Sequence, residues 1–152
     1  MTVKYDDKNN YGRLICIAKK HFDIWSQKNI KPQKAEMKLS YMPVIFNISS
    51  AGNTNNELSH KSLVHKQAMS RTLQELEDIG MIKSSVIDND KRSRKINLTV
   101  DGEKFVSNAN EELSQLVKQY IKIVGIKDFE TTINVLSKIV DFHEAKFEGD
   151  SV

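Results

Sequence analysis

The chain has 152 residues, of which 39% are hydrophobic, and a formal net charge of +3. This size and composition fit one folded unit with its own core, and the single cysteine excludes an intramolecular disulfide and a zinc site built from several cysteines. No stretch has the roughly 20 apolar residues that cross a bilayer, and the first residues lack the apolar core of a signal peptide. We therefore expect a cytoplasmic protein with no membrane partner.

The first part of the chain predicts three helices. Apolar residues at three- and four-residue spacings predict an amphipathic helix over residues 11–28. After a polar connection, the apolar segment 39–46 predicts a second helix in the core, with Ser40 as its cap and Pro43 in its first turn. The tetrapeptide Thr54-Asn55-Asn56-Glu57 has the pattern of a capping box and predicts a short third helix.

A fourth helix and a hairpin follow. Residues 66–79 place three apolar side chains on one helical face and polar side chains on the other. Gly80 then stands where a left-handed residue ends a helix, and the chain changes to strand-like alternation. Residues 88–91 have the composition of a hairpin turn, and basic side chains outnumber acidic ones around it. This basic tip favours contact with a polyanion such as DNA.

Two long helices are predicted after the hairpin. Thr99 can cap the first, in which apolar residues recur at nearly heptad spacing until Gly125 interrupts them. The second begins at about Asp128 and continues the apolar pattern. These apolar stripes are too long to be covered by the compact segment 36–99 alone, which predicts dimerisation. The alternative is that the stripes pack on each other within one chain.

The order of these elements predicts a mainly α fold class with a small β-hairpin wing. The expected organisation is a winged helix-turn-helix DNA-binding lobe at residues 36–99, flanked by dimerisation helices at residues 11–28 and 100–148 within a single 152-residue chain.

The second helix of a helix-turn-helix enters the major groove, so its outward side chains must bond to bases and phosphates. At the hairpin tip, Arg92 can enter the narrow minor groove if Asp90 braces it. The alternatives are an ordinary solvated helix face and a charged tip that serves only solubility. The hairpin that follows the helix favours DNA. The predicted DNA-binding residues are Lys66, Gln67, Ser70, Arg71, Gln74, Asp90, Lys91, Arg92 and Arg94.

The segment from Leu58 to Glu77, followed by Gly80, Asp90-Lys91-Arg92 and Leu98-Thr99-Val100-Asp101-Gly102, resembles the multiple-antibiotic-resistance regulator (MarR) family. The resemblance implies a homodimeric bacterial or archaeal transcription regulator that binds a pseudo-palindromic operator and responds to small molecules, metals or oxidants. It also implies that Ser70 and Arg71 face the groove, and that Arg92 enters the minor groove with Asp90 as its partner.

The chain departs from the family pattern at three places. Ser62 and Leu63 stand where the turn of the helix-turn-helix often has an apolar residue and a glycine, and His65 replaces a usual capping Asp or Ser. Pro43 lies about one position from where a proline is common in the second helix.

The resemblance also suggests two kinds of sensor. Family members often bind aromatic acids between the pairing helices and the DNA lobe, where candidate effector-binding residues are Arg13, His21, Trp25 and Tyr41. Others sense peroxides through a cysteine on the first helix, which makes Cys16 a redox candidate, since cations within one helical turn make a thiol more reactive. The alternative for Cys16 is a small buried apolar residue.

No metal site is predicted, because the four histidines are scattered, apart from His60 and His65 on either side of a turn. A glycine-rich phosphate loop, G-x-S-x-G and H-E-x-x-H are all missing, so we expect neither an enzyme nor a cofactor.

The function that we expect is sequence-specific binding of double-stranded DNA by a homodimeric transcriptional repressor. A small-molecule effector, aromatic or other, would release the repressor from an inverted-repeat operator. The alternatives are a peroxide or redox sensor that acts through Cys16, and a winged-helix protein-interaction module without DNA binding.

Overall fold

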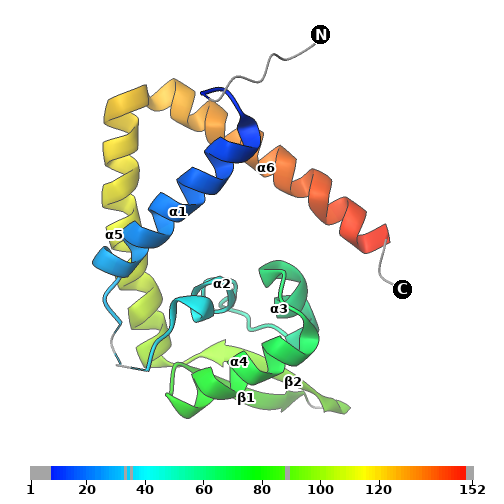
Figure 1. Ribbon diagram of the computed structural model, residues 1–152. Coiled ribbons are helices and arrows are strands. Elements are labelled where there is room, and N and C mark those ends of the chain that lie inside the picture. Colours follow the sequence, from blue (N-terminus) through cyan, green and yellow to red (C-terminus); the bar gives the residue numbers. More distant parts are fainter. Residues whose placement is uncertain (1–7, 33, 35, 88–89, 150–152) are drawn as a thin grey trace. The chain divides into compact units, whose positions relative to one another are not determined.

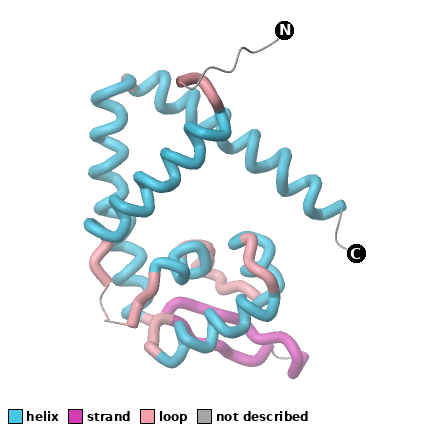
Figure 2. The backbone as a smooth tube through the Cα atoms, in the orientation of Figure 1, coloured by secondary structure: helices cyan, strands magenta, loops and turns pink. Residues whose placement is uncertain are grey.

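The computed structural model describes residues 8–32, 34, 36–87 and 90–149, and the side chains at positions 87, 90–93 and 146–149 lie outside this description. Figures 1 and 2 show a mainly helical chain with one hairpin, which confirms the predicted fold class. In chain order the elements are α1 (Tyr11–Asn29), the 3-10 helix η1 (Leu39–Tyr41), α2 (Met42–Ile45), α3 (Asn55–Ser62), α4 (Lys66–Asp78), β1 (Ile82–Ile87), β2 (Asp90–Leu98), α5 (Val100–Val124) and α6 (Ile126–Gly149). The chain divides into two compact units, with the boundary between Asn110 and Glu111.

The first unit contains the hydrophobic core. α4 contributes Met69, Leu73 and Leu76, which are the three apolar residues of its predicted inner face. Val44 and Ile45 of α2 are fully buried, as expected for a central segment. The remaining core residues come from η1, α3, the hairpin, the start of α5 and the loops between these elements: Ile30, Tyr41, Ile48, Leu58, Met81, Ile82, Ile96, Phe105 and Ala109.

The segment 39–46 differs from the prediction, because it forms a three-residue 3-10 helix and a one-turn α-helix instead of one longer helix. Ser40 lies inside the 3-10 helix, and the residue before α2 is Tyr41, whose side chain makes no capping bond, so the predicted Ser40 cap is wrong. The physical reason is burial: Tyr41 is only 3% exposed, and a tight turn brings its ring into the core before the helix begins. Pro43 does lie in the first turn of α2, where its missing N–H costs no bond.

The turn between α3 and α4 retains a helix-turn-helix geometry without the expected glycine. The capping box that starts α3 is confirmed, because Thr54 and Glu57 exchange side-chain to backbone bonds of 2.8 and 3.3 Å. After α3, Leu63 adopts the left-handed conformation, with φ of 52°, and His65 precedes α4 without a side-chain capping bond. A β-carbon in this conformation costs about 1 kcal/mol, so the turn carries local strain.

The hairpin is antiparallel, with Ile82 opposite Leu98 and Val86 opposite Arg94. Its register shifts beyond Val86, close to the predicted turn residues Asp88 and Asn89, which lie outside the described residues. On the other side of β2, Asn53 and Ile96 exchange backbone hydrogen bonds of 3.0 and 2.8 Å. β2 therefore has a hydrogen-bonded neighbour on each side at Ile96, namely β1 on one side and Asn53 on the other.

The end of α4, the start of β1 and the start of α5 meet in a junction at the open end of the hairpin, opposite its turn. Gly80 ends α4 with a φ of 73°, as predicted. The Thr99 hydroxyl donates to the Gly80 carbonyl at 2.6 Å and accepts from the Gly102 N–H at 3.1 Å, which confirms Thr99 as the cap of α5. Gly102 lies so close to β1 that a β-carbon there would overlap the Met81 carbonyl oxygen. This junction fixes the hairpin relative to the end of α4.

The second unit consists of the end of α5 and α6. α6 begins at Ile126, two residues before the predicted Asp128, because the Gly125 carbonyl already accepts the N–H of Phe129. Its large apolar side chains are mostly on the surface of the single chain: Ile133, Val135, Leu136, Val140 and Phe142. Of the helices in the described part of the chain, none combines the length and the apolar character needed to cross a membrane.

Candidate nucleic-acid interface

The outward face of α4 carries the side chains that the sequence predicted. Lys66, Gln67, Ser70, Arg71 and Gln74 are all exposed. The apolar side chains of the same helix are buried, so α4 is held to the lobe by one face and presents a polar face to solvent. This is the arrangement that a helix needs to enter the major groove.

Ser70 is less free than its exposure indicates. Its hydroxyl donates to the Lys66 carbonyl at 3.0 Å and accepts from the Asn55 side chain at 2.9 Å. Asn55 is the first residue of α3, and the sequence prediction did not include it in the site. The capping box could have identified it, since that motif places Asn55 in the first turn of α3.

Arg71 and Gln74 each bond to an acid one helical turn further on. Arg71 Nε donates to Glu75 Oε1 at 3.0 Å, and Gln74 Nε2 donates to Asp78 Oδ1 at 2.8 Å. The sequence prediction missed both acids, although spacing of four residues on a helix was the signal. These contacts orient the two polar side chains along the surface of α4.

The second half of α4 is acidic, but two of its acids bond to the rest of the lobe. Glu77 accepts from the Ser84 N–H at 2.9 Å and from the Ser84 hydroxyl at 2.7 Å, which attaches α4 to the hairpin. Glu75 accepts from Tyr41 Oη at 2.5 Å and from Lys38 Nζ at 3.0 Å. Hydrogen bonds from Tyr41, then Lys38, then Arg71 lower the pKa of the Glu75 carboxyl to about 2. The first two turns of α4 are therefore the part suited to approach a polyanion.

On the hairpin, Arg94 and Lys95 are exposed. Arg94 Nη1 lies 3.5 Å from Ser84 Oγ on the opposite strand, which is a weak contact for a charged donor. The backbones of Asp90, Lys91 and Arg92 belong to β2, whereas their side chains lie outside the described residues. The predicted Asp90–Arg92 brace therefore stays a prediction.

The four candidate effector residues lie in different environments. Arg13 and His21 are exposed on α1, and Trp25 is half-buried, with its ring 5.8 Å from that of Phe22. Tyr41 is buried and bonds to Glu75. Cys16 is a free thiol and is exposed in the single chain, where it is not a buried apolar residue.

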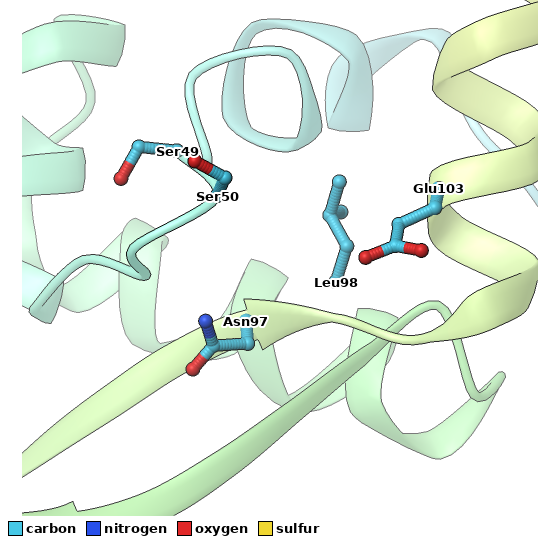
Figure 3. A pocket seen from close by; sticks show the side chains of 5 residues that line it. All are labelled: Ser49, Ser50, Asn97, Leu98 and Glu103. Atoms are coloured by element: carbon cyan, nitrogen blue, oxygen red, sulfur yellow. The ribbon is translucent and has the colours of Figure 1, made fainter.

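The lining of a cavity of about 160 Å³ includes none of these residues. It lies between two serines of the loop before α3, Asn97 of β2 and Glu103 of α5 (Figure 3). Its lining residues are Ser49, Ser50, Asn97, Leu98 and Glu103. This lining has hydroxyl, amide and carboxylate groups and no basic side chain, so it does not suit an aromatic acid. Among the residues that the structure describes, no three His, Cys, Asp or Glu side chains form a metal-binding group.

Comparisons with known proteins match this architecture. No family model matches the chain. BilQ, a helix-turn-helix-type transcriptional regulator of Clostridioides difficile (strain CD3), is 24% identical over 132 residues, which cover 87% of this chain and 88% of that protein. The crystal structure of the PcaV transcriptional regulator from Streptomyces coelicolor, in complex with its natural ligand, matches with a TM-score of 0.74 at 10% identity and covers 92% of this chain and 98% of that one.

A variant of MarR from E. coli in complex with operator DNA matches with a TM-score of 0.70 at 23% identity, over 91% of this chain and 99% of that one. The chain thus has the winged-helix fold of the MarR-type regulators, and the resemblance seen in the sequence is confirmed at the level of the fold. The first two of these proteins are transcriptional regulators, and the third is bound to operator DNA.

Proposed function

We propose that this chain, which has the MarR-type winged-helix fold, is a cytoplasmic transcription regulator that binds double-stranded DNA sequence-specifically. The observation that carries the proposal is the two-sided character of α4, whose apolar side is buried while Lys66, Gln67, Ser70 and Arg71 are exposed. Arginine and glutamine make paired hydrogen bonds to guanine and adenine in the major groove, and lysine contacts phosphate. The binding of operator DNA by the related MarR fold supports the same assignment.

The hairpin provides the second contact. Arg94 and Lys95 are exposed on β2, and Glu77 bonds to Ser84 and so links the hairpin to α4. We assign Arg92 to the minor groove, with Asp90 as its partner and Lys91 on phosphate. Two contact regions attached to one rigid lobe would grip DNA in adjacent grooves.

The active form is a homodimer. α1 exposes Tyr11, Leu14, Ile15 and Phe22, and α6 exposes a further apolar set, so a single chain leaves much apolar surface in water. A two-fold dimer covers such surface and presents two copies of α4 about 34 Å apart, in successive major grooves. The operator should therefore be an imperfect inverted repeat.

A small-molecule effector would release this dimer from its operator and relieve repression. The ligand complex of the related PcaV fold supports a bound effector, and Arg13, His21, Trp25 and Tyr41 remain the candidate residues. An oxidant that acts on Cys16 is the second candidate, because that thiol is exposed. Peroxide treatment of the wild-type chain and of Cys16→Ser separates them, since release that persists in the variant excludes the thiol.

The experiment that tests the function is selection of duplexes from a random library by the purified full chain. Enrichment of an inverted repeat is expected. Arg71→Ala should then lower affinity for the selected duplex by about 10- to 100-fold. Lys138→Ala, which also removes one positive charge but from the exposed surface of α6, should have little effect. No enrichment at low salt, or an equal loss in both variants, would contradict the proposal.

A further inference from the structure

One carboxylate joins α4 to a segment far away in the sequence. Glu75 accepts hydrogen bonds from Tyr41 and Lys38, which precede it by 34 and 37 residues, and from Arg71 on its own helix. The two carboxylate oxygens of Glu75 have different partners. Oε2 accepts from Tyr41 and Lys38, and Oε1 accepts from Arg71. Arg71 is therefore linked through Glu75 to the 3-10 helix η1.

The contact uses the Arg71 atom that base recognition needs least. The guanidinium is planar, so a bond through Nε restricts the orientation of the plane and leaves the two terminal nitrogens outside this contact. The Arg71 side chain is 83% exposed. An arginine held in this way loses little freedom when it meets a base, whereas an unbraced one must be ordered by the DNA.

Glu75 is itself anchored. Its side chain is 29% exposed, and the phenol that bonds to it belongs to Tyr41, which is 3% exposed and part of the core. Lys38 lies with Nζ 5.3 Å from the centre of the same ring and carries the opposite charge to Glu75. The position of η1 in the core thus determines where the Glu75 carboxylate can lie.

The neighbouring pair on α4 lacks this anchoring. Asp78 accepts from Gln74 in the same geometry of four residues, but Asp78 is exposed at the last residue of the helix. The two pairs therefore offer a matched comparison, one braced by the core and one on the surface.

We propose that Glu75 is a positioning residue that presents Arg71 to the base edges, and that Tyr41 and Lys38 hold Glu75 in the required place. This inference rests on the proposed DNA-reading role of α4. It assigns part of the sequence preference to η1, which would influence base recognition indirectly, through Glu75 and Arg71.

The test uses the full chain and the duplex selected by the wild type. The base pair read by Arg71 is the one whose replacement no longer weakens binding in Arg71→Ala, and the discrimination ratio is the ratio of Kd for the replaced duplex to Kd for the selected one. We expect Glu75→Gln and Tyr41→Phe to lower this ratio about tenfold. Both variants keep the size of the side chain, and thermal melting and the dimer fraction check their folding.

Asp78→Asn is the matched control. It also removes one negative charge from α4, so it should strengthen binding to both duplexes alike and leave the ratio unchanged. In the background of Arg71→Ala, Glu75→Gln should cause no further loss of discrimination, which a merely structural role would not predict.

Three results would overturn the inference: an unchanged ratio in Glu75→Gln and Tyr41→Phe, an equal decrease in Asp78→Asn, or additive losses with Arg71→Ala. In each case the wild type would still select DNA, so the proposed function would stand. A wild-type chain that selects no duplex would overturn both.

Discussion

α4 and α6 are both amphipathic, yet their apolar side chains have opposite surroundings in the single chain. Met69 and Leu76 of α4 are completely buried, whereas Ile133 and Val140 of α6 are 52% and 51% exposed. The lobe that contains α4 is therefore complete within one chain, because this helix is covered by the core of the same lobe. α6 offers a face that needs another surface. If two copies associate through α6 as proposed, the stability of α6 should depend on protein concentration, whereas that of the lobe should not.

The largest expected effect comes from breaking the lobe at its junction. Gly102→Ala places a methyl group on the Met81 carbonyl oxygen, and should lower the free energy of unfolding by about 3 kcal/mol in urea titrations. Gly12→Ala is the control, since the nearest atom to a β-carbon there lies at an ordinary 3.5 Å. A Gly102→Ala chain as stable as Gly12→Ala would mean that α5 can shift away from β1 without loss.

A charge on the exposed face of α6 should break pairing and leave the lobe folded. Leu136→Glu would bury a carboxylate between two copies, and we expect the dimer Kd to rise about 100-fold. Sedimentation equilibrium measures this change. Asn134→Glu adds the same charge at an exposed position whose neighbours at three- and four-residue spacings are all polar, and it should leave the Kd almost unchanged. Equal association in the two variants would show that α6 does not form the dimer surface.

The turn before α4 offers a gain in stability. Leu63→Gly removes the β-carbon from a left-handed residue, and should raise the free energy of unfolding by about 0.5 to 1 kcal/mol. Lys61→Gly, two residues earlier in α3, should lower it by a similar amount, because glycine disfavours a helix. Opposite signs from the two substitutions to glycine are the expected result. Two losses would indicate that Leu63 is not strained.

The smallest expected effect is a change in the pKa of a single carboxyl group, that of Glu75. The pKa of Glu75 lies at about 2 instead of 4.5, so the stabilisation by this carboxylate is present above pH 4.5 and is lost as the pH falls toward 2. Tyr41→Phe removes the largest cause and should raise the Glu75 pKa toward 4.5. NMR titration of the side-chain carboxyl measures it without DNA. An unchanged pKa would contradict the contact between Tyr41 and Glu75.

The sequence predicted the features that depend on near neighbours. The capping box of Thr54 and Glu57, the end of α4 at Gly80 and the cap at Thr99 all involve residues a few positions apart, and a local pattern specifies them. The exposed face of α4 was also predictable, because helical periodicity assigned its buried face.

Contacts between distant residues were not predictable in this way. Tyr41 enters the core and replaces a helix cap at Ser40 by a 3-10 turn, a choice made by tertiary packing. The bonds of Glu75 to Tyr41 and Lys38 span more than thirty residues, so periodicity along α4 gave no sign of them. The junction at Gly102 was not predictable either, because the lack of space for a β-carbon there is evident only when β1 is in place.

The single bridge between Asn53 and Ile96 has a consequence for solubility. An open strand edge is a template for another chain, and two-stranded ribbons have two such edges. Asn53 occupies the N–H and carbonyl of Ile96 at the most apolar part of β2, so a foreign strand cannot add there without displacing it. The outer strand, β1, carries the exposed Lys83 and Ser85, and a lysine on an edge discourages stacking into aggregates. One pair of backbone bonds and one charged side chain thereby protect the hairpin from fibril-like association.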